Sequence, residues 1–353
     1  MVWTADTGSV GNNGRRQWLG RMAKTKKTHR RRERLCGIAI DNKGGNLYNF
    51  MIISEVLSSR SFAPRTGIFP EKEVYMQVGV CVHFNDMETM PEKLAAVREN
   101  GFTSCQILSW PKEGLWTAEN AAELKKLLAE YGVVPSAFWC GLAGPAVWNF
   151  TEGPKTLGLV PPEYREMRIR NLCDGADFAA LLGITDVITH MGFIPENPND
   201  PEFIPFCDAV RTVAEHLQKK GQWILFETGQ ETPVTMIRCF ETVGTDNLGV
   251  NLDTANLILY GRANPVDALD VFGKYVRNLH AKDGFYPTDG THLGREVRLG
   301  DGKVDFEGVL KGLHTLGYDG AVTIEREISG EQQNIDIRHA KEYLESIIAR
   351  LDA

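Results

Sequence analysis

The sequence predicts an α/β fold, a closed (β/α)8 TIM barrel that follows a poorly structured, basic N-terminal extension. From Tyr75 onward, short apolar runs alternate with amphipathic runs, which is the pattern of βα units in a parallel sheet. Eight such pairs can be counted with no strand left over, as a complete barrel requires. The length of 353 residues suits one barrel with an added segment.

The apolar runs are the expected strands, and the expected helices lie between them. Strands are predicted at 75–82, 102–108, 133–139, 184–190, 223–227, 248–253, 277–281 and 321–325. Helices are predicted at 91–100, 118–131, 162–182, 202–220, 233–243, 265–275, 306–316 and 335–351. Glycines such as Gly132 and Gly183 follow the expected helix ends, where a left-handed residue caps the last turn. Prolines such as Pro162 and Pro233 stand at helix starts, where a missing N–H costs little.

We expect residues 1–74 to be an extension and residues 75–353 to be the catalytic domain. Residues 1–75 contain 14 Lys and Arg against 6 Asp and Glu, a net charge of +8, whereas the rest of the chain carries −15. A flexible extension or an upstream reading-frame addition is the favoured interpretation, and a nucleic-acid-binding arm is the alternative. The apolar stretch at 50–57 suits a short helix docked on the barrel.

Composition favours a cytoplasmic protein that acts on a small molecule. No apolar run reaches the ~18 residues of a membrane span, and the N-terminal segment lacks the pattern of a secretory signal. The seven cysteines have no CxxC spacing, which favours reduced thiols. The acidic body is a poor match for a polyanion, so we expect no nucleic-acid partner and no membrane partner.

Four of the expected strands end on residues that can bind a metal. These strand ends lie in QWILFETG, NLGVNLDTANL, VRNLHAKDG and YDGAVTIERE, and the residues are Glu227, Asp253, His280 and Glu325. In a closed parallel barrel, groups at successive C-terminal strand ends converge on one rim. Four polar groups there would be costly without a cation, which would also supply a Lewis acid. Three carboxylates and one imidazole therefore predict a site for one divalent cation.

The segments FETGQET, GVNLDTANL, NLHAKDG, LGDGKVDF and TIERE resemble those of the xylose-isomerase-like superfamily of sugar isomerases and epimerases. That superfamily includes the ketose 3-epimerases and the hydroxypyruvate isomerases, and the resemblance covers Tyr75 to Leu351. It implies one divalent metal, first of all Mn²⁺ with Mg²⁺, Co²⁺ or Zn²⁺ as alternatives, on the same Glu-Asp-His-Glu set. It also implies a small-molecule carbohydrate substrate and a homo-oligomer.

The reaction that the resemblance implies is proton transfer at a carbon next to a carbonyl. A metal that holds a ketose carbonyl and its neighbouring hydroxyl acidifies this proton, and one carboxylate can remove it to give an enediolate. A second carboxylate can return a proton on the opposite face. The resemblance assigns this acid/base pair to Glu227 and Glu325, with Glu327 as the backup for the latter.

Further candidates are expected to bind substrate at the same rim. His190 ends the fourth expected strand as a catalytic or hydroxyl-binding group, and His83 is a weaker candidate on the first. Lys282 shares a face with His280 and can meet a substrate oxygen, or form an ion pair instead. Trp148 lies in the long connection 140–161 and, with Trp110 and Trp139, suits an apolar wall against a sugar ring or ordinary packing.

The chain departs from the ketose 3-epimerases at two positions. Asn256 stands where they have a His, three residues after the Asp ligand, and we count it among the substrate-binding candidates. Tyr286 stands where they have an Arg, six residues after the His ligand. Arg295 or Arg298, in the long connection 284–305, is expected to replace that Arg.

Three other functions compete with the isomerase or epimerase. The first is a metal-dependent lyase that cleaves 3-oxo-glycosides and works with a small partner subunit; His190 and the Trp-bearing connection would suit its aglycone. A metal-dependent endonuclease is disfavoured, because the barrel is acidic and holds few His residues. A non-catalytic sugar-binding barrel would leave the metal site empty or structural.

Overall fold

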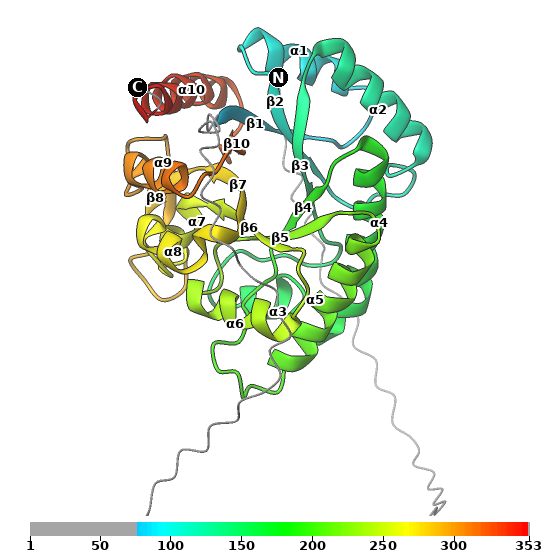
Figure 1. The fold of residues 1–353 in the computed structure, drawn as a ribbon, viewed down its shortest axis with the longest axis vertical. Helices are drawn as coiled ribbons and strands as arrows, with labels where there is room; N and C mark the ends of the chain where they lie inside the picture. Colours follow the sequence, from blue (N-terminus) through cyan, green and yellow to red (C-terminus); the bar gives the residue numbers. More distant parts are fainter. Residues whose placement is uncertain (1–75, 352–353) are drawn as a thin grey trace, which may run out of the picture. The chain divides into compact units, whose positions relative to one another are not determined.

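The computed structural model describes residues 76–351, which form the expected closed barrel of eight parallel strands surrounded by helices (Figure 1). Around the barrel the strands follow the order β1-β10-β7-β6-β5-β4-β3-β2. Their bounds are β1 Gln77–His83, β2 Ser104–Ser109, β3 Val134–Cys140, β4 Asp186–Thr189, β5 Trp223–Glu227, β6 Leu248–Asp253, β7 Val276–Ala281 and β10 Ala321–Ile324. The basic extension and its expected helix lie outside the described residues.

The helices follow the strands in the predicted alternation. They are α1 Met90–Glu99, α2 Ala118–Tyr131, α4 Pro162–Leu182, α5 Phe203–Gln218, α6 Pro233–Val243, α8 Pro265–Phe272, α9 Phe306–Thr315 and α10 Glu331–Leu351. The predicted bounds of α2, α4 and α6 are confirmed, because the residues that cap a helix lie next to its ends in the sequence. Thr117 accepts a hydrogen bond from the backbone N–H of Asn120 at the start of α2, and Gly132 closes it with φ 61°.

Several elements differ from the prediction. Helix α10 begins at Glu331, four residues before the predicted start, and a 3-10 turn, η1 Gly273–Tyr275, completes α8. Two short helices, α3 Gly153–Thr156 and α7 Thr254–Leu259, lie in segments predicted as connections. The connection after β7 contains an antiparallel hairpin, β8 Asp283–Phe285 and β9 Arg295–Val297. These elements are too short to give a readable period.

The interior of the barrel divides into an apolar half and a polar half. Alternate residues of a strand face the same side, so the residues two positions before the inward-facing ligands also point inward. The apolar half is a cluster formed by Leu108, Ala137, Trp139, Ile188 and Leu225 of strands β2 to β5, with Gln106 of β2 as a buried polar exception. The polar half is formed by Asn251, Asn278 and Thr323 of β6, β7 and β10, which are also buried.

Two features bear on the protein's environment. Within residues 76–351, no helix combines the length and the apolar character needed to cross a bilayer. The six cysteines in this part of the chain are free thiols.

Candidate metal centre and active site

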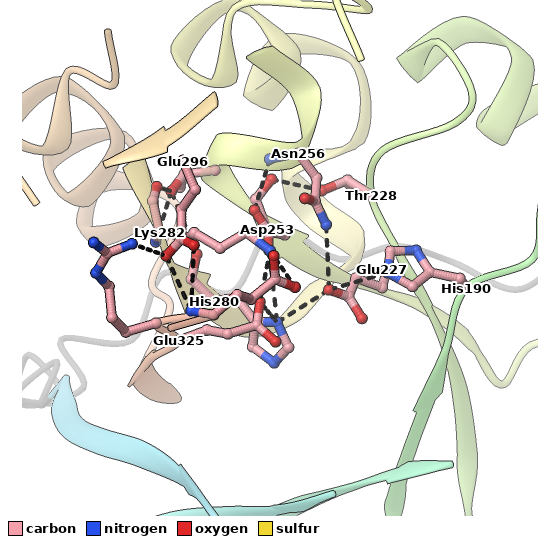
Figure 2. A network of polar contacts seen from close by, with 12 residues as sticks. His190, Glu227, Thr228, Asp253, Asn256, His280, Lys282, Glu296 and Glu325 are labelled. Carbon is pink, nitrogen blue, oxygen red and sulfur yellow. Dashed lines mark hydrogen bonds and ion pairs between the residues drawn. The ribbon is translucent and has the colours of Figure 1, made fainter. Parts of the chain in front are cut away.

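The four predicted ligands converge at the C-terminal ends of adjacent strands (Figure 2). Glu227 and Asp253 are the last residues of β5 and β6, His280 lies near the end of β7, and Glu325 directly follows β10. One ligand atom from each lies within 4.8 Å of the other three. His280 Nδ1 is 3.2 Å from Glu227 Oε1, 3.8 Å from Asp253 Oδ2 and 3.3 Å from Glu325 Oε2.

Local backbone requirements orient Asp253. This residue is the N-cap of α7, and its Oδ1 accepts a hydrogen bond of 2.7 Å from the backbone N–H of Asn256. Its Oδ2 accepts no hydrogen bond and lies among the other ligand atoms. The threonines after the ligands tie the strand ends together: Thr228 donates to the Asp253 carbonyl at 2.8 Å, and Thr254 donates to the Lys282 carbonyl at 2.6 Å.

Glu227 is held by donors from three directions. The indole N–H of Trp139 donates to Oε2, and Asn256 Nδ2 donates to Oε1 at 3.4 Å. His190 Nε2 lies 3.5 Å from Oε1. Burial would raise the pKa of Glu227, but the nearby rings of His190 and His280 outweigh burial and lower it. The carboxyl group is therefore held ionised.

His280 is oriented by Gln106, which reaches it across the barrel interior from β2. Gln106 Oε1 lies 2.6 Å from His280 Nε2, so Nε2 carries the proton and Nδ1 presents its lone pair to the carboxylates when the ring is neutral. Burial would lower the pKa of His280, but Glu325 and Glu227 raise it well above its usual range. Any cation bound here therefore has to displace a proton from this ring.

Lys282 supplies a positive charge directly beside the ligands. Its buried Nζ lies 2.9 Å from Glu325 Oε2, 3.1 Å from Asp253 Oδ2 and 3.3 Å from Glu327 Oε1. Burial would raise the pKa of Glu325, but Lys282 and His280 hold it well below its usual range. Burial would likewise lower the pKa of Lys282, but Asp253 and Glu325 raise it well above its usual range.

The donor set fits a divalent cation of intermediate hardness. Oxygen ligands at about 2.1 Å from a common ion lie at most about 4.2 Å from one another. The observed limit of 4.8 Å needs only a small contraction to reach that geometry. The Asp253 Oδ2 atom is buried and accepts no hydrogen bond, although Lys282 Nζ lies 3.1 Å away, so it keeps a lone pair that an ion could use.

Comparison with known proteins is consistent with this geometry. Residues 94–347 match the family model described as the xylose isomerase-like TIM barrel. The chain belongs to this family. A xylose isomerase domain protein from Planctomyces limnophilus is 31% identical and has a TM-score of 0.74, over 78% of this chain and 99% of that chain.

More distant members share the fold. A Mycobacterium smegmatis protein in complex with magnesium is 20% identical with a TM-score of 0.60, over 79% of this chain and 98% of that one. An L-ribulose 3-epimerase is 17% identical with a TM-score of 0.59, over 78% and 95%. An inosose dehydratase from Lacticaseibacillus casei is 24% identical over 147 residues, 36% of this chain. The chain spans 48% to 64% of the length of the curated relatives it matches.

Of the other candidates in this xylose isomerase-like barrel, some lie beside the four ligands and two arginines do not. His190 directly follows β4 beside Glu227, and the ring of Trp148 meets His190 edge-on at a centroid distance of 5.0 Å. Asn256 lies on α7 next to two ligands, and Glu327 reaches Lys282 from the segment after β10. The last predicted strand, 321–325, is one residue too long, because β10 ends at Ile324, where its paired register with β7 also ends.

The two arginines of the connection after β7 have other contacts. Arg295 lies on β9 with its guanidinium 5.3 Å from the ring of Phe285, and Arg298 forms an ion pair of 3.1 Å with Asp301. Among the described contacts, none joins either arginine to the four ligands. Their role in substrate binding stays a prediction.

Sequence reasoning missed two residues that support the centre. Gln106 lies in the middle of β2, and only the closed barrel reveals that it reaches His280. Gln230 follows β5, where its Nε2 lies 3.2 Å from His190 Nδ1 and donates to the Tyr260 hydroxyl at 3.0 Å. A polar residue within the apolar run FTSCQIL was the one available signal for Gln106.

Proposed function

We propose that this protein is a divalent-metal-dependent isomerase or epimerase of a small carbohydrate, acting by proton transfer next to a carbonyl group. The observation that carries the proposal is the convergence of Glu227, Asp253, His280 and Glu325 at one end of the barrel. Mn²⁺ is the ion we propose first, with Mg²⁺, Co²⁺ or Zn²⁺ as alternatives. When bound, the ion supplies a Lewis acid that polarises the substrate carbonyl.

Glu227 and Glu325 are the proposed acid/base pair. Their strands are separated in the barrel by β6 and β7, so the two carboxylates flank the position above Asp253 and His280. The lowered pKa values of both carboxyls keep them ionised near neutral pH, so that either can accept the carbon-bound proton. To invert the centre, the other carboxylate must take up a proton from solvent before it gives one to the opposite face of the enediolate, and the first carboxyl then releases its proton to solvent.

The neighbouring polar side chains would bind and orient the substrate. The Lys282 ammonium lies beside Glu325 and can stabilise negative charge on a substrate oxygen. Asn256 and His190 both lie beside Glu227 and can meet hydroxyl groups on that side. Trp148, packed on His190, would offer an apolar ring face to the substrate.

A second candidate function is elimination from the same intermediate. His190 Nε2 lies 3.5 Å from Glu227 Oε1. His190 could therefore give a proton to a departing group while Glu227 acts as the base. The likeness to an inosose dehydratase is in keeping with this reaction. Cleavage of a 3-oxo-glycoside is the form of elimination that we carry as the alternative. The homo-oligomer and the partner subunit stay predictions.

The deciding experiment is hydrogen exchange at carbon. Mn²⁺-loaded protein in D₂O is incubated with ketoses, keto-sugar phosphates and 3-oxo-glycosides, and deuterium incorporation is followed by NMR. We expect exchange next to a carbonyl that disappears in Glu227→Gln, in Glu325→Gln and after chelation of the metal. The exposed Glu163 on α4 gives the matched control Glu163→Gln.

The product distinguishes the two candidates, since an epimer indicates epimerisation and a released group indicates elimination. If no compound exchanges although metal is bound, the proton-transfer function is wrong.

A further inference from the structure

Two tryptophans remain exposed at the mouth of the barrel. The side chain of Trp148 is 47% exposed and that of Trp110 is 40% exposed. Single exposed apolar residues are common on proteins and need no explanation. Both belong to one row of rings, His83-Trp110-Trp139-His190-Trp148, with successive centroids 5.6, 5.0, 6.0 and 5.0 Å apart. Trp148 is the last ring of the row and Trp110 is the second.

The row of rings is connected directly to the proposed base. Trp139 donates its indole N–H to Glu227, and His190 lies 3.5 Å from the same carboxylate. Trp110 and Trp148 each contact one of these two residues. A ring attached to a sugar held at Glu227 would therefore extend toward the exposed faces of Trp110 and Trp148.

The loop that carries Trp148 is fixed rather than loose. Arg168 of α4 is 1% exposed, and its guanidinium donates to three loop carbonyls, those of Ala143 at 3.1 Å, Pro145 at 2.8 Å and Gly158 at 2.7 Å. Burying an arginine in this way is costly unless its donors are satisfied. A buried arginine therefore holds in place the loop that carries the exposed ring of Trp148.

The same loop forms one wall of the mouth. The backbone N–H of Phe150 donates to the Thr291 carbonyl of the connection after β7 at 3.0 Å, although β3 and β7 are on opposite sides of the barrel. Phe150 also packs edge-on against Tyr260 at a centroid distance of 6.2 Å. These contacts join the connection after β3 to the connection after β7 and to Tyr260, directly after α7, at the C-terminal end of the barrel.

The ring of Trp110 is also held in place by packing. Its ring lies against Gly141, where an added Cβ would overlap the indole. Its plane is parallel to the His83 ring within 1°. The Trp110 indole thus presents a rigid apolar face.

We propose that Trp110 and Trp148 form a second subsite, which binds the face of a ring attached to the reacting sugar. The substrate class is then a glycoside, with an aryl aglycone or a second sugar ring, rather than a free ketose. This inference rests on the proposed function for the position of the reacting sugar.

The test is ligand binding to Mn²⁺-loaded protein by titration calorimetry. The ligands are the 3-oxo derivatives of methyl, phenyl and glucosyl β-glucoside, which share the reacting sugar and differ in the attached group. We expect phenyl or glucosyl compounds to bind roughly tenfold or more tightly than the methyl compound. Whichever of the two is preferred identifies the attached ring.

Variants show whether the tryptophans cause the preference. Trp148→Ala and Trp110→Ala should each reduce it several-fold, while Leu181→Ala, which removes an exposed apolar side chain from α4, should leave it unchanged. Trp148→Phe should retain part of it. Equal affinity for all three ligands, or a preference that survives in both tryptophan variants, overturns the proposal.

Failure of the subsite and failure of the proposed function give different results. Glu227→Gln should lose deuterium exchange yet keep the ring preference. Exchange without any ring preference removes the subsite and leaves the function intact. A tryptophan-dependent preference without exchange on any compound removes the proposed function and leaves the subsite intact.

Discussion

The two halves of the barrel interior differ in chemistry although they belong to one closed sheet. In the apolar half, Ile188 and Leu225 are fully buried and pack with Ala137. In the polar half, Asn251 is equally buried, yet neither its amide nitrogen nor its amide oxygen has a hydrogen-bond partner. The polar half lies beneath the ligands of β6, β7 and β10, so polarity continues downward from the candidate site.

This difference between the halves suggests that one half mainly stabilises the fold and the other mainly serves function. Apolar side chains inside a barrel contribute through burial, at about 25 cal/mol per Å². Buried amides without partners cost roughly 1–3 kcal/mol each, so they persist where a site requires them. Residues of the apolar half should therefore control folding, and residues of the polar half should control metal binding and turnover.

The largest effect should come from two residues of β5 on one face, Leu225 and Glu227. We expect Glu227→Gln to lower turnover by roughly 10³-fold or more while the protein stays folded, because the amide keeps the size and shape of the carboxylate but cannot accept the proton. Steady-state kinetics and calorimetric unfolding check this. Retained turnover would contradict the role of Glu227 as a base.

Leu225→Ala should have the opposite outcome. A buried leucine truncated to alanine costs roughly 2–5 kcal/mol of unfolding free energy, because transfer and cavity terms add. Asn251→Leu, the matched change in the polar half, should cost far less because no hydrogen bond is lost. Urea unfolding of both variants measures the contrast, and equal losses would remove the distinction between the halves.

Bound metal should stabilise the folded protein, and this gain should depend on the ligands and not on the apolar half. At a free Mn²⁺ concentration of about 100 times Kd, the folded state gains roughly 2.7 kcal/mol. The gain should vanish in Asp253→Asn and persist in Ile188→Val, measured as the shift in melting temperature between Mn²⁺ and EDTA. A shift that survives in Asp253→Asn would place the ion elsewhere.

A buried carboxyl outside both halves should make stability fall with pH. Both carboxylate oxygens of Glu231 lack hydrogen-bond partners, and burial raises its pKa to about 8. The folded state thus keeps a proton that the unfolded chain releases near its ordinary pKa, so stability is lost as pH rises between these values. Between pH 6 and 8 the loss is about 2 kcal/mol. Glu231→Gln should flatten this slope in thermal unfolding, and an unchanged slope would assign it to other groups.

The smallest effect should come from Gln106, a positioning residue that crosses from β2 to the ligands. Gln106→Leu removes the acceptor for His280 Nε2 and should weaken Mn²⁺ binding about tenfold. Titration calorimetry with Mn²⁺ measures this, and Gln106→Glu, which keeps an acceptor, should restore affinity. Equal affinities in all three proteins would show that Gln106 does not orient the ring.

The sequence by itself determined the alternation of strands and helices, because burial period, helix caps and turn glycines are local. It also indicated Glu227, Asp253, His280 and Glu325, because each ends an apolar run that a parallel barrel brings to one rim. It did not reveal α7 or the β8–β9 hairpin, whose bounds depend on neighbouring elements.

Only the tertiary structure decided which residues support that rim. Gln106 and His280 are 174 positions apart in the chain, and Trp139 and Glu227 are 88 apart. Arg168 reaches its loop from a helix that looks like any amphipathic segment. Such contacts depend on barrel closure and strand register, which set distances across the interior that no local pattern encodes.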